Sequence, residues 1–246
     1  MGKFGPLSEE FLETLPNKYL DLVYAEQSEE QILDLYLPEA EPHPEGYPVI
    51  VFIHGGAFAN GYQRESQILP ALRALDRGFA VAGLRYRKSR EARFPAMLYD
   101  GKAALRFLRA NAGRYRLDGS RIAVWGASSG AWLASMLGVT AGNPAFEDLS
   151  MGNGDQDSSV QAVVDWCGPC GNFLLMDEDL RQSGKGRANH SESQSPESRF
   201  MGCAIPEIPE LVSLACPMRY CGPDTPPILL VHGAEDEVVP VEQSAR

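Results

Sequence analysis

Residues 121–139 have the sequence RIAVWGASSGAWLASMLGV. The first five residues are predicted to form a strand buried in a sheet. Residues 129–139 are small or apolar on every side, as expected for a central buried helix. The pentapeptide GASSG, residues 126–130, joins the two segments. The stretch therefore predicts a sharp turn that leads directly from a buried strand into a buried helix.

A turn of this kind suits a nucleophilic serine. It pushes the hydroxyl of its central residue out of the sheet and crowds the positions two before and two after, so both must be small. Gly126 and Gly130 meet this demand. The helix N-terminus adds amide N–H groups and a partial positive charge that stabilise an oxyanion. We predict Ser128 as a nucleophile; a tight turn in which Ser128 only caps the helix is the alternative.

The rest of the chain alternates strand-like and helix-like segments, which indicates an α/β fold with a mostly parallel central sheet flanked by helices. An internal repeat is not apparent. We expect buried strands at 49–53, 79–84, 121–125, 160–166 and 228–232, an edge strand at 31–37, and helices at 8–15, 67–75, 96–111 and 129–139.

Two polar stretches, 142–159 and 177–201, carry few structure signals. One interpretation is that both are surface loops. The other is that they are cap or flap insertions over an active site, because long ordered loops in compact domains are often lids.

A second glycine-rich motif, His54-Gly55-Gly56-Ala57-Phe58, follows the strand predicted at 49–53. Preorganised backbone donors stabilise the negative charge that develops on a tetrahedral intermediate, and glycines let the backbone approach a substrate. The motif precedes the serine turn, as in ester hydrolases with an oxyanion loop of the HGGG type. An ordinary glycine-rich turn is the alternative, and we interpret His54 as a structural residue that holds the loop by hydrogen bonding.

A candidate acid, Asp236, follows the last predicted strand in the sequence His232-Gly-Ala-Glu-Asp236. A loop at the C-terminal end of a strand is a place where an acid can orient an imidazole. The order of Ser128 before Asp236 requires a histidine later in the chain, but none follows before Arg246.

The four histidines of the chain do not fill this role well. His43 lies in a proline-rich stretch, while His54 and His232 end strands; His190 lies in the second polar stretch and is the one mobile candidate. We expect that the sequence is a truncated copy that lacks the last strand, the last helix and the catalytic histidine. In that case the strand at 228–232 would be left as a hydrophobic sheet edge, which favours aggregation.

The sequence Cys167-Gly168-Pro169-Cys170 offers a different function. It resembles the redox motif of thioredoxins, and a cysteine pair at a helix N-terminus would have a lowered pKa and exchange disulfides. About 160 residues of α/β pattern precede the motif, and the segment after it does not continue as a long amphipathic helix. We therefore favour incidental cysteines at a strand end and keep a thiol–disulfide redox protein as an alternative.

Several motifs together resemble the α/β-hydrolase superfamily. Within it they resemble the esterase and lipase branch that includes bifunctional feruloyl and acetyl xylan esterases. The likeness runs from about residue 20 to the end of the chain. The matching pieces are Asp34-Leu-Tyr-Leu-Pro38, His54-Gly-Gly-Ala-Phe58, Gly126-Ala-Ser-Ser-Gly130, Val160-Gln-Ala-Val-Val-Asp-Trp166, Ser195-Pro-Glu-Ser198 and His232-Gly-Ala-Glu-Asp236 with Val239-Pro240.

The resemblance implies one α/β-hydrolase domain over residues 1–246, incomplete at its C-terminal end. It implies a serine ester hydrolase that acts through an acyl-enzyme on small acyl or carbohydrate esters, without a metal or an organic cofactor. Ser128 would be the nucleophile and Asp236 the triad acid, with backbone oxyanion donors from Gly56, Ala57 and Ser129. A non-catalytic hydrolase-like binding protein is a further alternative, against which the intact serine turn and acid argue.

Two departures from the family pattern stand out. Ala57 replaces a glycine of the oxyanion loop, which is a small change if its φ stays negative. Ala131-Trp132 replaces the usual small residue or histidine pair after the serine turn, so either the helix packing or the pocket wall is expected to differ.

The composition limits the possible partners. The chain has 22 basic and 33 acidic residues and a formal net charge of −11, which disfavours nucleic acids and anionic membranes. An odd number of five cysteines, with no apolar export signal at the start, suggests reduced thiols in the cytoplasm. We expect a small-molecule ester as the partner; the oligomeric state is left open.

Overall fold

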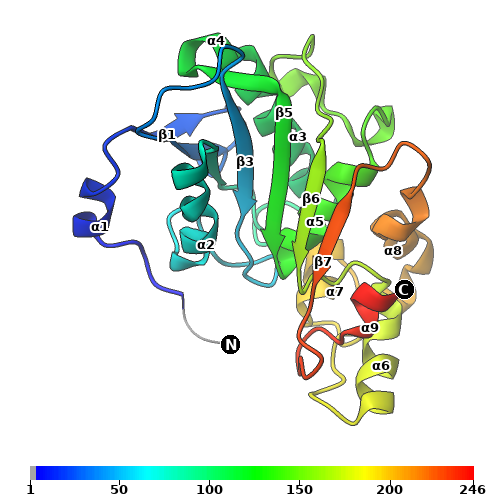
Figure 1. Cartoon of the computed structure of the whole chain (residues 1–246). Helices are drawn as coiled ribbons and strands as arrows, with labels where there is room; N and C mark the ends of the chain where they lie inside the picture. Colours follow the sequence, from blue (N-terminus) through cyan, green and yellow to red (C-terminus); the bar gives the residue numbers. More distant parts are fainter. Residues whose placement is uncertain (1–3) are drawn as a thin grey trace.

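A seven-stranded sheet forms the centre of the molecule (Figure 1), in a computed structural model that describes residues 4–246. The strands follow the chain in order. They are β1 Lys18–Val23, β2 Ile32–Tyr36, β3 Tyr47–Ile53, β4 Ala80–Leu84, β5 Leu117–Ala127, β6 Ala162–Trp166 and β7 Ile228–Val231.

The strand order in the sheet is β1-β2-β4-β3-β5-β6-β7. The strand β2 pairs antiparallel with both β1 and β4, and the neighbours from β4 to β7 are all parallel. The carboxyl ends of the parallel strands therefore meet at one end of the sheet, the lower end in Figure 1. In open α/β sheets this is the end where ligands bind.

The prediction of an α/β fold with a mostly parallel sheet is confirmed, and a strand is present at each of the five positions predicted as buried, although β7 is an edge strand and largely exposed. The prediction of an edge strand at 31–37 is wrong, because β2 lies between β1 and β4. The strand β2 is hydrogen-bonded to a neighbouring strand at each of its two edges, and the side chains of Leu33, Leu35 and Tyr36 are fully buried. The strand at its outer side, β1, was not predicted.

Helices cover both faces of the sheet (Figure 1). The face with α2 carries a small apolar cluster that includes Phe52, Ile68 and Val81. The opposite face carries α3 and α5, which contact each other and β5, and the larger apolar cluster. The helices are α1 Glu9–Glu13, α2 Leu69–Leu72, α3 Ala96–Ala110, α4 Ala112–Tyr115, α5 Ser129–Val139, α6 Met176–Ser183, α7 Pro196–Met201, α8 Pro209–Leu214 and α9 Glu242–Ala245.

The long predicted helices at 96–111 and 129–139 correspond to α3 and α5. The helix predicted at 67–75 is instead a succession of 3₁₀ turn, four-residue α2 and 3₁₀ turn, which ends at Gly78 with φ 81°. The stretch 177–201 is not an irregular loop, because it contains most of α6 and all of α7. Within residues 4–246, no helix has the length and apolar character needed to cross a membrane.

The strand β7 is the second edge of the sheet and presents apolar side chains to solvent. Leu229, Leu230 and Val231 are 59%, 46% and 45% exposed. An edge strand offers unpaired backbone groups to other chains, and apolar side chains on it make such pairing favourable.

We predict that replacing Leu229 with lysine reduces self-association of the chain, because a charge on the edge opposes strand pairing. Leu214→Lys, an equally drastic change on α8 at a residue 38% exposed, is the control and is expected to have no such effect. Sedimentation velocity over a concentration series measures the outcome. Equal behaviour of the two variants and the parent chain would contradict the prediction.

Candidate active site

The predicted serine turn is present between β5 and α5. Ser128 has φ 53° and ψ −123°, a positive-φ conformation that costs a non-glycine residue about 1–3 kcal/mol. Its backbone N–H donates to the carbonyl of Trp166 at 2.8 Å, and its carbonyl accepts from the N–H of Ala131 at 2.9 Å. The turn is thus fixed between the end of β6 and the first turn of α5.

The two glycines around Ser128 are required by close packing. A Cβ on Gly126 would collide with the carbonyl of Gly130. A Cβ on Gly130 would collide with the carbonyl oxygens of Ile53 and His54 at the end of β3. The first turn of α5 therefore lies directly against the ends of β5 and β3, which is the physical reason for small residues at both positions.

The His-Gly-Gly loop lies beside Ser128. A Cβ on Gly55 would lie only 3.1 Å from the Cβ of Ser128, so the two backbones are in close contact. The N–H of Gly55 donates to Oε1 of Gln67 at 3.0 Å. The loop is thereby tied to the 3₁₀ turn that precedes α2.

The backbone of the loop continues through Gly56, Ala57 and Phe58 with φ values of 137°, 54° and 61°. The condition of a negative φ at Ala57 is not met, so alanine stands in a conformation that glycine adopts more readily. Burial of Phe58 compensates for this strain. Its ring stacks on Phe200 of α7 with 4.3 Å between ring centroids, which anchors the loop in the core.

Three backbone N–H groups in this region have no partner of their own. The N–H groups of Gly56, Ala57 and Ser129 pair with no acceptor among residues 4–246. Unpaired donors near a nucleophile are what an oxyanion hole consists of. Ser129 itself is buried, and its Oγ also has no hydrogen-bond partner among residues 4–246.

His54 holds the loop from within the core. Its Nδ1 lies 2.7 Å from the carbonyl oxygen of Gly55, and its ring stacks on Tyr86 at 4.5 Å between centroids. Burial, with Lys88 nearby, lowers the pKa of His54 to about 3. A neutral ring that donates Nδ1–H to Gly55 is consistent with the structural role expected for this residue.

Asp236 lies in the segment 233–239 that follows β7, which we call the acid loop. Its Oδ1 accepts from the backbone N–H groups of Val238 at 2.8 Å and Val239 at 3.0 Å. Its Oδ2 lies 3.6 Å from Nε2 of His232. The carboxylate is therefore oriented by its own loop, with one oxygen left for a further partner.

A cavity of about 570 Å³ opens between these elements. Ser128 and Asp236 both line it, although they are more than 100 residues apart in the chain. Its wall is mostly apolar with acidic residues on one side. The lining residues are Phe4, Ser66, Gln67, Pro70, Ala127, Ser128, Trp166, Cys167, Glu235, Asp236, Glu237, Val238 and Val239.

Not every predicted site residue lines this cavity. Gly56, Ala57 and Ser129 are absent from its wall, and the contact between the oxyanion loop and Ser128 is made by Gly55. No histidine of residues 4–246 lines it either. In the described chain, no three or more histidine, cysteine or acidic side chains are grouped so that they could hold a metal ion.

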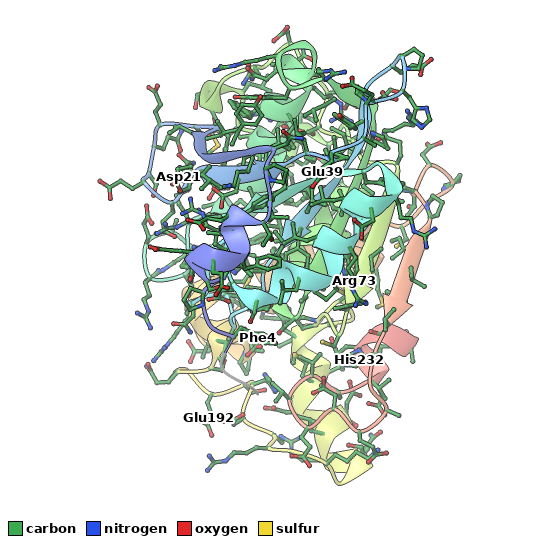
Figure 2. The ribbon with its side chains drawn as sticks, turned by 60° about the vertical axis from the view of Figure 1, so that its left-hand side comes forward. Phe4, Asp21, Glu39, Arg73, Glu192 and His232 are labelled. Carbon is green, nitrogen blue, oxygen red and sulfur yellow. The ribbon has the colours of Figure 1, made fainter. Side chains whose placement is uncertain are left out.

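The two histidines closest to the acid loop are already engaged. His232 contacts Oγ of Ser244 at 2.6 Å and the carbonyl of Val239 at 2.9 Å. His190 contacts the carbonyl of Val238 at 2.9 Å. Figure 2 shows the position of His232 in the lower half of the molecule, where the carboxyl ends of the parallel strands lie.

The residues of the cavity wall that sequence reasoning did not assign to the site include Gln67, Trp166 and Cys167. Trp166 ends β6 and Cys167 follows it, and the carboxyl end of a strand next to the serine strand was an available signal. Gln67 carries no such signal, because its role depends on the fold that brings it to Gly55.

The departure at Trp132 affects helix packing. Trp132 is fully buried, donates from Nε1 to the carbonyl of Ala215 at 2.7 Å, and packs against Phe58 and Phe200. It does not line the cavity with Ser128. The indole of Trp132 fills the space between α5 and the loop of residues 54–58.

The cysteine pair 167/170 lacks the features of a redox centre. The thiol of Cys170 is buried and donates to Oδ2 of Asp165 at 2.7 Å, and burial with this carboxylate raises the pKa of Cys170 well above its usual range. Burial also raises the pKa of Cys167. A reactive dithiol needs the opposite shift.

The two segments proposed as flaps occupy different places. Residues 142–159 pack against α3, where Arg106 donates to the carbonyl of Gly152 at 3.2 Å, at the upper right in Figure 1. Residues 177–201 lie at the lower end, next to the acid loop. Neither segment lines the Ser128 cavity, and their function as flaps stays a prediction.

The sheet, its covering helices and the strand–turn–helix around Ser128 define the α/β-hydrolase class. The chain belongs to the BD-FAE family, whose model matches residues 33–246. The resemblance to esterases of the α/β-hydrolase superfamily is thereby confirmed.

Similar proteins include named esterases. Esterase LipC of Mycobacterium tuberculosis is 30% identical over 224 residues, which are 87% of this chain and 50% of LipC. The chain spans about half the length of curated relatives that it matches. Sequence comparison thus supports the placement of this chain among esterases and carboxylic ester hydrolases.

Two solved structures are similar throughout the chain. A truncated form of a carbohydrate esterase from gut microbiota has a TM-score of 0.81 at 31% identity, and the match covers 98% of this chain and 84% of that one. A bifunctional GH43-CE protein of Bacteroides eggerthii has a TM-score of 0.79 at 34% identity, covering 93% of this chain and 30% of that one.

We predict that Gly130→Ala destabilises the chain by about 1–3 kcal/mol, the usual cost of overpacking, and impairs Ser128 reactivity because the first turn of α5 must move. Gly113→Ala is the control. Its Cβ would meet no atom within 4 Å, and alanine is the better helix former in α4. Urea unfolding of both variants measures the difference, and equal stability would contradict the packing argument.

We predict that Cys167 and Cys170 do not cycle as a dithiol. Treatment of the native chain with diamide should leave both reduced, because neither thiolate is favoured at neutral pH. Alkylation followed by peptide mass spectrometry measures this, with the exposed Cys221 as the internal control for reagent access. A peptide carrying a 167–170 disulfide would contradict the prediction.

Proposed function

We propose that this chain carries the catalytic serine of a carboxylic-ester hydrolase that acts through an acyl-enzyme. The observation that supports this most directly is the cavity into which Ser128 and Asp236 both open. The left-handed turn at Ser128 adds to it, because such a turn exposes a hydroxyl at the end of the sheet.

The proposed reaction has two steps. Ser128 Oγ attacks the ester carbonyl carbon and gives its proton to a base, and the bond to the alcohol breaks as the alcohol takes up that proton. Water then attacks the acyl-serine and releases the acid. The backbone N–H groups of Gly56, Ala57 and Ser129 are the proposed donors to the tetrahedral oxyanion.

Asp236 is proposed as the triad acid. Its Oδ1 is held by two backbone N–H groups, which leaves Oδ2 to orient an imidazole and stabilise its protonated form. None of the histidines in residues 4–246 lines the cavity. We therefore propose that the base that takes the proton of Ser128 is a group other than these histidines. We therefore propose slow turnover for the 246-residue chain alone.

The cavity suggests a small, uncharged acyl group. Its wall includes Pro70, Trp166 and Val238, while Glu235 and Glu237 at its acidic side would repel anionic substrates. The similarity to a carbohydrate esterase supports a carbohydrate ester as the substrate class, with acetyl and other short acyl groups as the first candidates.

A non-catalytic hydrolase-like protein is the second candidate. The observation that favours it is the absence of histidine from the cavity wall formed by residues 4–246. The two candidates differ in one measurable property, which is the nucleophilicity of Ser128 when a base is available.

We predict that free imidazole accelerates acylation of Ser128 by p-nitrophenyl acetate, because it can occupy the cavity as the missing base. Loss of the histidine of a serine triad costs about 10⁶-fold in turnover, so the unaided rate should be low and the gain measurable. Stopped-flow release of p-nitrophenol, with an acetylated peptide containing residue 128 identified by mass spectrometry, measures this.

Ser128→Ala is the matched control and subtracts the hydrolysis that imidazole catalyses in solution. Equal rates for the parent chain and Ser128→Ala at every imidazole concentration would favour the non-catalytic candidate. Rapid turnover without imidazole would instead refute the argument that the described histidines are unable to serve Ser128.

A further inference from the structure

Residues 184–191, between α6 and α7, lie against the acid loop; we call this segment the strap. Lys185 Nζ donates to the carbonyl of Ala234 at 2.9 Å and to Oε1 of Glu235 at 2.8 Å. The backbone of Gly186 packs so tightly on Glu237 that a Cβ there would collide with its carbonyl. In Figure 1 the strap and the acid loop lie together below the sheet.

The third contact is made by His190, which is buried between the strap, α7 and the acid loop. Its Nε2 lies 2.9 Å from the carbonyl oxygen of Val238. Its Nδ1 lies 3.0 Å from Oε2 of Glu197, which is itself buried. Both ring nitrogens therefore face oxygen acceptors, one across a hydrogen-bond contact and one at ion-pair distance, and the doubly protonated ring can donate to both while Glu197 is a carboxylate.

We propose that His190 is a positioning residue for the acid loop. As an imidazolium it links Val238 to Glu197 and thereby fixes Asp236 at the rim of the Ser128 cavity, and it releases the loop when it loses its proton. The link to Asp236 is direct, because the N–H of the same Val238 donates to Oδ1 of Asp236. The consequence for catalysis rests on the function proposed above, whereas the release of the loop does not.

The charges around His190 give the direction of this pH dependence. Two carboxylates face it, Glu197 from α7 and Asp177 from α6, whose oxygens also accept the N–H groups of His190 and Ser191. The acid loop contacts it through the uncharged carbonyl of Val238. Burial alone would lower the pKa of His190, but Glu197, this carbonyl and Asp177 outweigh it and raise the pKa above 6.5.

A raised pKa means that the stabilisation is complete below the ordinary pKa of 6.5 and is lost as the pH rises through the raised value. Above that value the remaining proton stays on Nδ1, facing the Glu197 carboxylate, and the Nε2 lone pair then opposes the carbonyl of Val238. The acid loop should thus be held at slightly acidic pH and freed at alkaline pH, with a loss of up to about tenfold per pH unit above the pKa.

Hydrogen–deuterium exchange of the full chain between pH 5.5 and 9 tests this without any variant. Protection of a peptide covering 234–240, corrected for the intrinsic pH dependence of exchange, should decrease with a midpoint above 6.5. The N–H groups of Val238 and Val239 report directly, because both donate to Asp236. Protection that stays constant over this range would overturn the proposal.

Variants separate this role from simple packing. His190→Gln should give low protection without a pH midpoint, and Glu197→Gln should move the midpoint to lower pH because the neighbouring charge is lost. His43→Gln is the matched control, because His43 is an exposed histidine of the segment before β3, and it should leave the midpoint unchanged. A midpoint that persists in His190→Gln would overturn the proposal.

The consequence for Ser128 has its own measurement. The imidazole-dependent acylation rate of the parent chain, divided by that of His190→Gln at the same pH, should decrease towards one with the midpoint seen in exchange. A ratio that does not change with pH would overturn the positioning role. If Ser128 is never acylated, the proposed function fails, while the exchange data still decide whether His190 holds the loop.

Discussion

The close contact between the first turn of α5 and the ends of β3 and β5 is the constraint on which the candidate site depends. Gly126 and Gly130 leave no space for a Cβ because their neighbours are backbone carbonyls, which are not able to rotate away as a side chain would. This contact forces the left-handed conformation at Ser128 and brings its Cβ against Gly55. One steric condition thus sets both the conformation of Ser128 and its distance from the loop of residues 54–58.

The backbone strain in this region is offset by the burial of neighbouring side chains. Ser128, Ala57 and Phe58 all have positive φ, and strained backbone of this kind persists only where the surroundings determine it fully. Phe58 inserts its ring among aromatic side chains of α5 and α7, while His54 is fixed on Tyr86. The aromatic cluster therefore does more than fill the core, because it holds the loop in the conformation that leaves its amides unpaired.

The parts of the fold that were predictable from the sequence are those with a local signal. Continuous apolar runs predicted β3 to β7, and the GASSG turn predicted the start of α5, because strand formation and steric crowding act on adjacent residues; burial on both faces does not extend to β7. The strand β1 has an alternating exposure and was missed, which in turn produced the wrong edge assignment for β2. Long-range contacts, such as Gln67 with Gly55, had no local signal.

The same distinction explains the errors at the candidate site. The positive φ of Ala57 accompanies the insertion of Phe58 between α5 and α7, a long-range contact that the residue type at position 57 does not reveal. The stretch 177–201 looked irregular because its polar residues serve specific partners: Asp177 accepts backbone N–H groups of the strap, and Glu197 faces His190. Polar composition was therefore a poor guide to a segment whose hydrogen bonds lie within the protein.

Ser128 and Asp236, the proposed nucleophile and acid, are held in place in different ways. Ser128 lies between central strands, and its geometry follows from backbone contacts that side-chain chemistry does not alter. Asp236 follows β7, which pairs with β6 on one side and is exposed on the other. A loop that extends from an edge strand receives little restraint from the sheet, so side chains have to position it. In this molecule Lys185 and His190 provide those contacts, which makes the acid side of the site the part whose order responds to solution conditions.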